Sequence, residues 1–540
     1  MNATGNRRWW ALAAITLAIL AVGLDLTVLS VALPTLATAL HASEADLQWF
    51  SAGYALALAA AMLPAGVLGD RFGRKKIMLI SLVLFGIGSI GCAYAPDPEL
   101  FIAARVVLGV AGAGLTVTAL SVITVIFSEE ERPRAVGIWA AANFLALPIG
   151  PILGGWVLSQ FWWGWVFLMN VPVVAIGLVA VIALVPESRA ETKPGLDPIG
   201  IVTSSGGIAL LVYGLIEAGV NGWNDVASLS LIIGGIAVIV AFGFWERFLA
   251  GRRGSDPLVD LTLFHSAAFT WGVILAACGI LTMVGVMFTA PQYFQAVLGL
   301  DAQGSGLRLL PLIGGLVIGA VPANRVVAAI GSKFTTALGF ALMAAGLLIG
   351  SGTTVTSSEL FLAIWLAVFG LGIGLALTTA ASAALAVLPT ERAGVGSAIM
   401  STMQKLGSPL GAAIIGSVAS SAYVAHLTLT GLPDAVASAA RSSVFAGLGV
   451  ADKLGSAVLR SEVESAFTHG MDIALLVSAG SAVAGLILAL IFIPKRAAAR
   501  RGDEDDHGGH DRGRAARTQE GAHAALHSAS GVAPVSRTGL

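Results

Sequence analysis

Apolar runs recur along almost the whole chain and are separated by short polar connections. Each run holds roughly 18 or more residues without a charge, which at about 1.5 Å per residue is enough to cross about 30 Å of hydrocarbon. The runs lack the alternation of a membrane β-barrel, so helices are the remaining way to satisfy the backbone in lipid. We divide them into fourteen spans, which begin near Ala11, Leu47, Ile77, Leu100, Ala135, Trp165, Ile199, Leu229, Ala268, Leu307, Phe334, Leu360, Gly394 and Met471.

The composition agrees with this pattern. Of the 540 residues, 56% are hydrophobic and only 11% are charged, whereas an average soluble domain is about a quarter charged. We therefore predict an all-α polytopic membrane protein whose environment is the lipid bilayer, and we expect no nucleic-acid partner.

Connections that carry lysine or arginine alternate along the chain with connections that carry neither. None occurs in the connections near residues 42–46, 96–99, 159–163, 219–225, 291–305 and 352–358. The other connections carry Arg71, Arg74, Lys75, Lys76, Arg132, Arg134, Arg189, Lys193, Arg247, Arg252, Arg253, Lys333, Arg392, Lys495, Arg496, Arg500 and Arg501. This asymmetry follows the positive-inside rule. It predicts a multi-pass protein of the cytoplasmic membrane with both termini in the cytoplasm, and a longer outer segment at 421–470.

Function is expected where ionisable groups enter the apolar spans, because such groups need a partner or a water-filled cavity. Asp25 lies about fourteen residues into the first span, roughly 21 Å deep. Arg105 enters the fourth span from the other side by about five residues, roughly 8 Å, and so reaches a similar depth. Two interpretations are open: a fixed ion pair that holds two helices together, or a carboxylate that carries a proton under the control of the arginine.

Several segments resemble one known family. Residues 25–34, DLTVLSVALP, resemble the first-span signature of the fourteen-span drug:proton antiporters of the major facilitator superfamily, the QacA/EmrB-like group. Further similar segments are 66–76 in the loop after span two, 105–112 in span four, 150–155 in span five, and 388–397. The resemblance covers about residues 11–494.

This resemblance implies the major facilitator fold, with two six-helix bundles and two extra transmembrane helices. The expected parts are an N-terminal bundle at 1–190, two linker helices at 191–260, a C-terminal bundle at 261–494 and a disordered cytoplasmic tail at 495–540. It also implies a proton-coupled antiporter that exports drugs or other amphipathic small molecules by alternating access. No cofactor is expected, because the proton gradient supplies the energy, and we expect a functional monomer.

The motifs also have physical interpretations. Glycines let the loop after span two turn tightly, and small residues and prolines in span five allow close helix packing and bending. By resemblance, the cytoplasmic gate motif comprises Gly66, Asp70, Arg71, Gly73 and Arg74, and the antiporter motif comprises Pro148, Gly150, Pro151, Gly154 and Gly155. A weaker second copy of the gate motif is expected at Asn324, Arg325, Gly331 and Lys333.

Lys405 departs from the family pattern, because relatives usually have an uncharged amide there. It lies roughly 17 Å into its span, so it must be paired, neutral or hydrated. Asp25 and Glu217 are candidate partners; alternatively, Lys405 attracts an anionic substrate and repels a cation.

An apolar cavity between the bundles is the expected substrate site. The candidate lining residues are Trp49, Tyr54, Asn143, Glu217, Met283, Phe288, Tyr293, Gln404 and Lys405. For each of them the alternative is ordinary packing inside the protein, without contact to a substrate.

Other functions remain as alternatives. Proton-coupled uptake and the flipping of a lipid-like molecule would use the same fold, and an ion channel is a more distant possibility. An intramembrane enzyme is disfavoured, because such enzymes need paired acids, a Ser/Lys dyad or histidine ligands in their spans, and all eight histidines lie in loops, span edges or the tail. We therefore expect no catalytic residues and no metal site.

Overall fold

The computed structural model describes residues 5–128, 131–189, 197–251, 261–387, 393–429 and 432–493, and these ranges contain helices but no strand. The tail predicted at 495–540 lies outside them. Twelve described helices are long and apolar enough to cross a membrane, and the two arms of α2, which meet at 46°, raise the number to thirteen. Helix α5 (Arg132–Gln160) lies where the remaining span is expected. The fourteen predicted spans are consistent with this arrangement.

The first half of the chain encloses a continuous apolar core, which extends from Ala11 to Val185 and includes Phe288 from the second half. Side-chain caps fix where two of its helices begin: Ser43 forms a capping box with Asp46, and Asp97 accepts the backbone N–H of Leu100. The helices are α1 (Gly5–Ala39), α2 (Glu44–Phe72), α3 (Arg74–Ala93), α4 (Pro98–Ile126), α5, α6 (Trp165–Leu168) and α7 (Asn170–Leu184).

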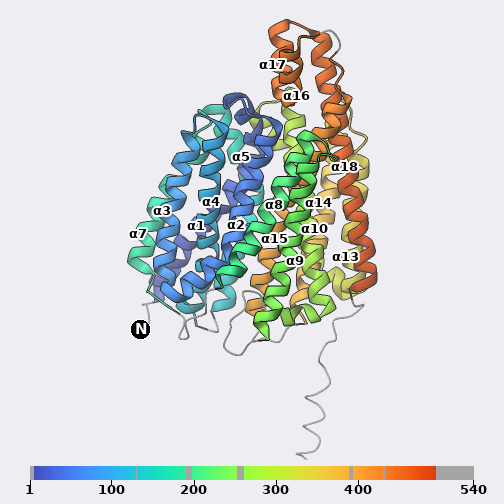
Figure 1. The fold of residues 1–540 in the computed structure, drawn as a ribbon. Helices are drawn as coiled ribbons and strands as arrows, with labels where there is room; N and C mark the ends of the chain where they lie inside the picture. Colours follow the sequence, from blue (N-terminus) through green and yellow to red (C-terminus); the bar gives the residue numbers. More distant parts are fainter. Residues whose placement is uncertain are drawn as a thin grey trace, which may run out of the picture. The chain divides into compact units, whose positions relative to one another are not determined.

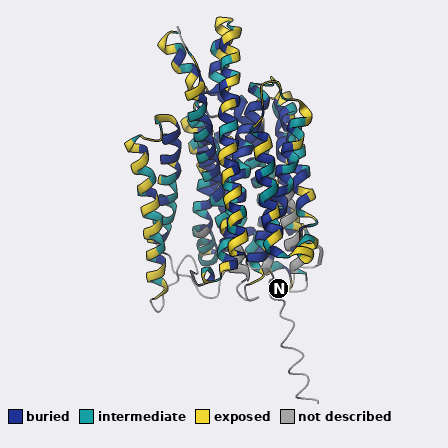
Figure 2. Cartoon of the chain, turned by 90° about the vertical axis from the view of Figure 1, so that its right-hand side faces the viewer, coloured by how far each residue is buried: buried dark blue, intermediate teal, exposed yellow. Residues whose placement is uncertain are grey.

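Helices α8 (Pro198–Asn221) and α9 (Val226–Ala250) lie where the two extra spans are predicted. Helix α8 packs against α9, α2 and α15, and therefore contacts both halves of the chain. Helix α9 exposes Ile233, Ile236 and Val240. Figure 2 shows such exposed residues along the outward faces of the helices, with buried residues toward the centre. Apolar side chains on an outward face are suited to contact with lipid tails.

The second half builds a second apolar core, which extends from Leu275 to Ile493 and includes Val31 of α1. Its last helix begins at Ala457, fourteen residues before the expected start near Met471, and runs for 36 residues. The elements are η1 (Leu261–His265), α10 (Ala267–Ala296), α11 (Ala302–Arg308), α12 (Leu310–Ala320), α13 (Ala323–Gly350), α14 (Glu359–Leu385), α15 (Ala393–His426), α16 (Asp434–Ser442), α17 (Val444–Leu454) and α18 (Ala457–Phe492). Helices α16 and α17 project at the top of Figure 1.

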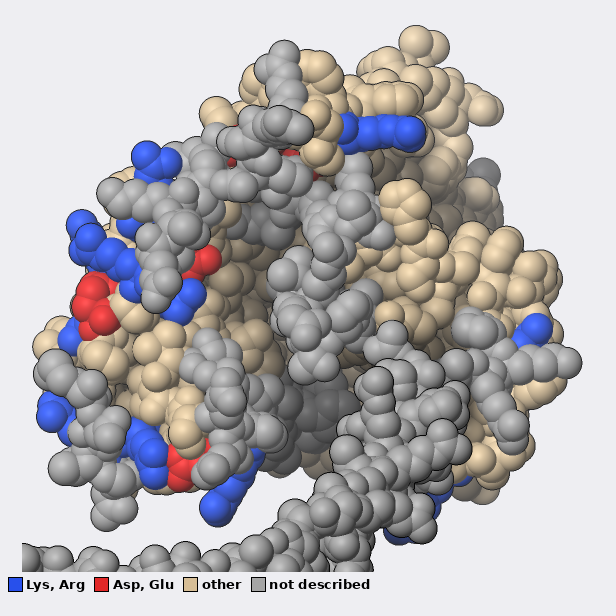
Figure 3. Space-filling model, turned by 90° about the horizontal axis from the view of Figure 1, so that it is seen from below, with Lys and Arg blue, Asp and Glu red and all other residues tan. Residues whose placement is uncertain are grey.

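We name the two ends of the helices from Figure 1. The lower end is the one at which α1 begins, and the upper end is the one that carries α16 and α17. The α2–α3 connection at the lower end carries Arg71, Arg74 and Lys75. Figure 3 shows Lys and Arg side chains over this face.

Corresponding turns of the two halves share a backbone feature. Gly73 joins α2 to α3 with φ 121°, and Gly331 interrupts α13 with φ 83°. Residues that carry a Cβ rarely adopt such positive φ values, so both positions favour glycine. The predicted second copy of the gate motif therefore has the same kind of turn as the first.

Candidate functional site

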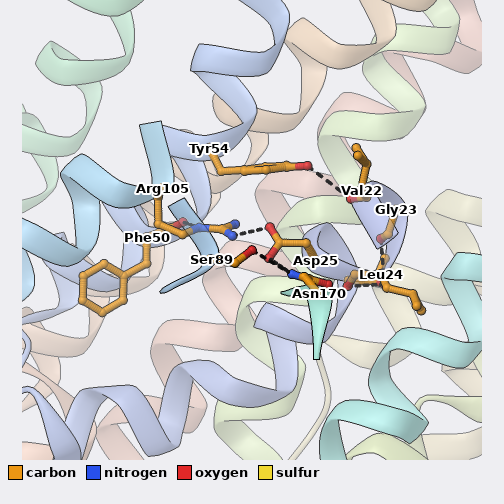
Figure 4. Close-up of polar contacts among 10 residues, drawn as sticks. Val22, Gly23, Leu24, Asp25, Phe50, Tyr54, Ser89, Arg105 and Asn170 are labelled. Atoms are coloured by element: carbon orange, nitrogen blue, oxygen red, sulfur yellow. Dashed lines mark hydrogen bonds and ion pairs between the residues drawn. The ribbon is translucent and has the colours of Figure 1, made fainter. Parts of the chain in front are cut away.

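Asp25 and Arg105 meet inside the first half. Asp25 lies on α1 and Arg105 on α4, and the Arg105 Nη1 donates to Asp25 Oδ2 at 2.5 Å. Both residues are buried, with 3% and 0% of their surface exposed. Figure 4 shows the two side chains pointing toward each other across the helices. The similar depth inferred from the sequence thus brings the two groups into contact.

Helix α2 holds the guanidinium of Arg105 in place. The Arg105 Nε donates to the carbonyl oxygen of Phe50 at 3.0 Å. The ring of Tyr54 lies 4.4 Å from the guanidinium carbon, as a cation–π contact requires. The Tyr54 hydroxyl donates to the carbonyl of Val22 at 3.2 Å, which ties α2 to α1 (Figure 4). Arg105 Nη2 is buried without a hydrogen-bond partner.

Asn170 is a part of this site that the sequence reasoning missed. Its amide donates to Asp25 Oδ1 at 3.5 Å and to Ser89 Oγ at 3.4 Å, so it connects α7 and α3 to the acid (Figure 4). One available signal was an amide two residues before Pro172 in an otherwise apolar run. Asp25 therefore has a cationic partner on one oxygen and a weaker neutral partner on the other.

Two adjoining cavities lie between the halves. The lower cavity, with a volume of about 220 Å³, is lined by Gly23, Leu26, Thr27, Ala146, Ile280, Met283, Val284, Leu316, Ala320, Gly374, Leu377, Thr378, Gln404, Lys405 and Ser408. The upper cavity is lined by Leu26, Thr27, Leu29, Ser30, Leu33, Ser51, Arg105, Met283, Val284, Met287, Phe288, Leu312, Ile313, Leu316 and Ser408. Arg105 thus belongs both to the ion pair and to a cavity wall.

Four of the predicted substrate residues line these cavities. Met283 lines both, Phe288 lines the upper one, and Gln404 and Lys405 line the lower one. Lys405 is partly buried. It forms an ion pair with neither Asp25 nor Glu217, the two partners considered from the sequence: Asp25 pairs with Arg105, and Glu217 accepts the amide of Asn221 at 2.8 Å.

The other predicted lining residues lie elsewhere. Trp49 packs against Tyr213 of α8, with ring centroids 5.8 Å apart. The buried Tyr293 donates its hydroxyl to the carbonyl of Thr354 at 2.6 Å. With Tyr54 and Glu217, these residues are absent from the walls of the two cavities. Asn143 and Pro148 are in α5, but their side chains lie outside the described part of the structure.

The glycines of the antiporter motif lie at two close contacts of α5. On the α1 side, Gly150 and Gly154 face Thr27 and Val28, and a Cβ at Gly154 would lie 2.7 Å from the Val28 side chain. On the α11 side, a Cβ at Gly155 would lie 2.6 Å from the carbonyl oxygen of Ala302. Carbon atoms cannot approach so closely, so these positions require glycine.

The antiporter motif also touches the second half through Pro151. The carbonyl oxygen of Pro151 lies 2.4 Å from where a Cβ of Gly306 on α11 would be. The motif therefore helps to close the upper end between the two halves.

Hydrogen bonds between the halves gather at the same upper end. They run from Gln292 to Glu44 at 3.4 Å, from Gln295 to the carbonyl of Val31 at 3.0 Å, from Ser417 to Gln48 at 3.1 Å and from Ser159 to Gln303 at 3.3 Å. The carboxylate of Glu44 is buried in this interface, and the sequence reasoning did not single it out.

The gate motif at the lower end contacts its own half. Asp70 accepts the Arg74 side chain at 2.9 and 2.8 Å, and the Arg74 backbone N–H donates to the carbonyl of Ser188 at 2.9 Å. The Arg71 guanidinium lies over the ring of Phe72. Among the described residues, Asp70 and Arg71 form no hydrogen bond or ion pair with the second half. Gly66 packs against Val117 of α4, and Gly73 is the turn described above.

Curated relatives cover nearly the whole chain. The sequence is 30% identical to the tetracenomycin C resistance and export protein of Streptomyces glaucescens, over 90% of this chain and 91% of that protein. It is 32% identical to the multidrug efflux pump LfrA of Mycolicibacterium smegmatis, over 89% of this chain and 97% of that protein.

Solved structures show the same fold. A bacterial homologue of the human lysosomal transporter Spinster, in an inward-facing and unoccupied conformation, matches with a TM-score of 0.65 at 17% identity, over 92% of this chain and 99% of that one. A D-xylose–proton symporter matches with a TM-score of 0.60 at 15% identity, over 90% and 98%. Residues 15–412 match the sequence pattern of the Major Facilitator Superfamily. The chain belongs to the Major Facilitator Superfamily.

Proposed function

We propose that this protein exports drug-like amphipathic molecules across the cytoplasmic membrane in exchange for protons. The export of small molecules is supported by its relatives, which include a resistance and export protein and a multidrug efflux pump. Apolar cavities between the halves support binding of such molecules near the middle of the bilayer. No cofactor is part of this proposal, and one chain is proposed to be sufficient.

The observation that carries the proton coupling is the contact of Asp25 with Arg105 beside the upper cavity. A proton on Asp25 removes the charge that attracts the guanidinium, so the contact between α1 and α4 weakens. Because Arg105 also lines the cavity wall, the same change alters the surface that a substrate meets. Proton binding and substrate binding thereby compete through one pair of side chains.

The two ends of the molecule have separate roles in this proposal. The upper end, closed by Gly155 and the hydrogen bonds between the halves, is assigned to the outside. The lower end, with Arg71, Arg74 and Lys75, is assigned to the cytoplasm by the positive-inside rule. Proton entry from outside would accompany reopening toward the cytoplasm, where deprotonation of Asp25 accompanies substrate capture.

The energy supply is sufficient. One charge that moves through 100 mV yields about 2.3 kcal/mol. At a membrane potential somewhat above 100 mV, the entry of one proton per substrate supports a substrate concentration gradient of roughly a hundredfold.

Inside-out membrane vesicles with an acidified lumen test the proposal. The measurement is accumulation of ethidium, anthraquinone-2-carboxamide and anthraquinone-2-carboxylate in the lumen. The wild type is expected to accumulate at least one of them, and Asp25→Asn is expected to reduce pH-driven accumulation at least tenfold. Glu217→Gln is the matched control, because this acid contacts Asn221 and not Arg105. Undiminished pH-driven accumulation by Asp25→Asn would refute the coupling, and movement in the opposite direction would favour uptake.

A further inference from the structure

Lys405 on α15 is a cation beside the lower cavity that has no role in the proposed proton coupling. Its side chain lines the lower cavity and has no hydrogen bond or ion pair with any described residue. About twelve residues separate it from the start of the helix, or roughly 18 Å of helix. A cation at that depth is costly unless water or an anion compensates its charge.

The helices around the lower cavity supply no free acid to Lys405. These helices are α1, α5, α10, α12, α14 and α15. Across their described lengths, the acidic residues are Asp25 on α1 and Glu359 on α14. Asp25 is paired with Arg105, and Glu359 at the upper end is paired with Arg308. The charge of Lys405 is therefore uncompensated by these helices.

Three neutral groups next to Lys405 can donate hydrogen bonds into the same cavity. Gln404 and Ser408 lie on α15, one residue before and three residues after the lysine, and Thr378 lies opposite on α14. None of the three has a hydrogen-bond partner among the described residues. Each of these groups can both donate and accept, so beside an ammonium group each can turn its N–H or O–H toward a bound anion.

Apart from Thr27, the rest of the lower cavity is apolar. Leu26, Ile280, Met283, Leu316 and Leu377 come from α1, α10, α12 and α14 and contribute hydrocarbon surface. A ligand that matches this wall has an apolar ring system with one ionised carboxyl group directed at α15. A lipophilic cation would meet the same hydrocarbon surface but would be repelled by the ammonium group.

We propose that the lower cavity selects amphipathic organic anions, and that Lys405 is the residue that recognises their carboxylate. This inference rests on the proposed export function for the fate of the ligand, but the binding step stands by itself. Gln404, Ser408 and Thr378 complete the anion site by donating hydrogen bonds.

Binding to the purified full-length chain tests this directly. Isothermal titration compares anthraquinone-2-carboxylate with its neutral isostere anthraquinone-2-carboxamide, which shares the ring system. A charge-assisted contact predicts that the wild type binds the carboxylate tenfold to a hundredfold more tightly. Lys405→Gln is expected to abolish this preference and to leave carboxamide binding within about twofold, and Lys405→Arg is expected to retain it.

Controls separate a specific site from general effects of charge or folding. Lys453→Gln removes a lysine from the exposed surface of α17 and is expected to leave both affinities unchanged. Carboxamide binding by Lys405→Gln reports whether the cavity is intact. Equal affinity of the wild type for the two compounds, an absence of carboxylate binding, or an unchanged preference in Lys405→Gln would each overturn the inference.

Transport of the same compounds distinguishes this proposal from the export proposal. If the wild type prefers the carboxylate through Lys405 but never accumulates it with an acidified lumen, the anion site stands and proton-driven export fails. If ethidium is exported in an Asp25-dependent way but the wild type binds the carboxylate no more tightly than the carboxamide, the export proposal stands and the anion site fails.

Discussion

In the described part of the chain, Arg105 and Lys405 are cations that lie between the membrane helices, and their surroundings differ. Arg105 is fully buried, is paired with Asp25, donates to the carbonyl of Phe50 and lies against Tyr54. Lys405 is only partly buried and lines a cavity without a partner. The first group already has an acid, a carbonyl oxygen and an aromatic ring as partners, and only its Nη2 lacks one among the described residues. The second is available to a ligand.

The two proposed tasks, substrate selection and proton control, fall in adjoining cavities. The lower cavity, which contains Lys405, shares Leu26, Thr27 and Ser408 with the upper cavity, which Arg105 lines. A molecule that spans both would contact Lys405 and Arg105 at once, the cations to which we assign substrate selection and proton control. Competition between proton and substrate then needs no long-range pathway.

The largest expected effect breaks the paired site. Arg105→Gln removes the partner of a buried carboxylate, and breaking such a pair costs about 3–5 kcal/mol. We expect a loss of this size in the free energy of unfolding, measured by titrating the protein in mixed micelles with dodecyl sulfate. The double variant Asp25→Asn, Arg105→Gln removes both charges and is expected to recover most of the loss. A double variant no more stable than Arg105→Gln would show that the two side chains are not coupled.

A smaller effect is expected from the neutral partner of Asp25. Asn170→Ala removes two long hydrogen bonds, of 3.5 Å to Asp25 and 3.4 Å to Ser89. Each is near the limit of hydrogen-bond length, so we expect a loss of about 1 kcal/mol in the same unfolding assay. Asn221→Ala is the control, because that amide bonds to Glu217 on α8. A loss as large as that of Arg105→Gln would make Asn170 a principal support of the acid.

The membrane-spanning helices were predictable from hydropathy, whereas the two-bundle arrangement was expected only from the family resemblance. The runs that begin near Ala11, Leu100 and Ala268 correspond to α1, α4 and α10. The start of α18 was the largest error, because the helix continues beyond the apolar run: residues 457–470 contain Arg460, Glu462 and Glu464. Hydropathy shows where a helix enters lipid, and it does not show where the helix ends in water.

The candidate site was predictable only in part, for a physical reason. Depth follows from counting residues along a helix, and it brought Asp25 and Arg105 to the same level. The direction in which a side chain points depends on the rotation of the helix about its axis, and an almost uniformly apolar helix carries little sequence signal for that rotation. Trp49 and Tyr293 were therefore placed at the cavity, whereas they pack away from it.

The smallest expected effect tests the claim that Lys405 has no partner. Lys405→Met keeps a long flexible side chain of similar size and removes the charge. If no ion pair is lost, the free energy of unfolding should change by less than about 1 kcal/mol, or should rise, because no charge remains to be desolvated. The measurement is the same titration in mixed micelles, without ligand, beside Arg105→Gln. A loss near that of Arg105→Gln would mean that Lys405 is paired in the folded protein, and the contrast between the two cations would disappear. Lys405→Met could also be as stable as the wild type without ligand but gain no stability from anthraquinone-2-carboxylate. That result would assign the role of Lys405 to binding alone.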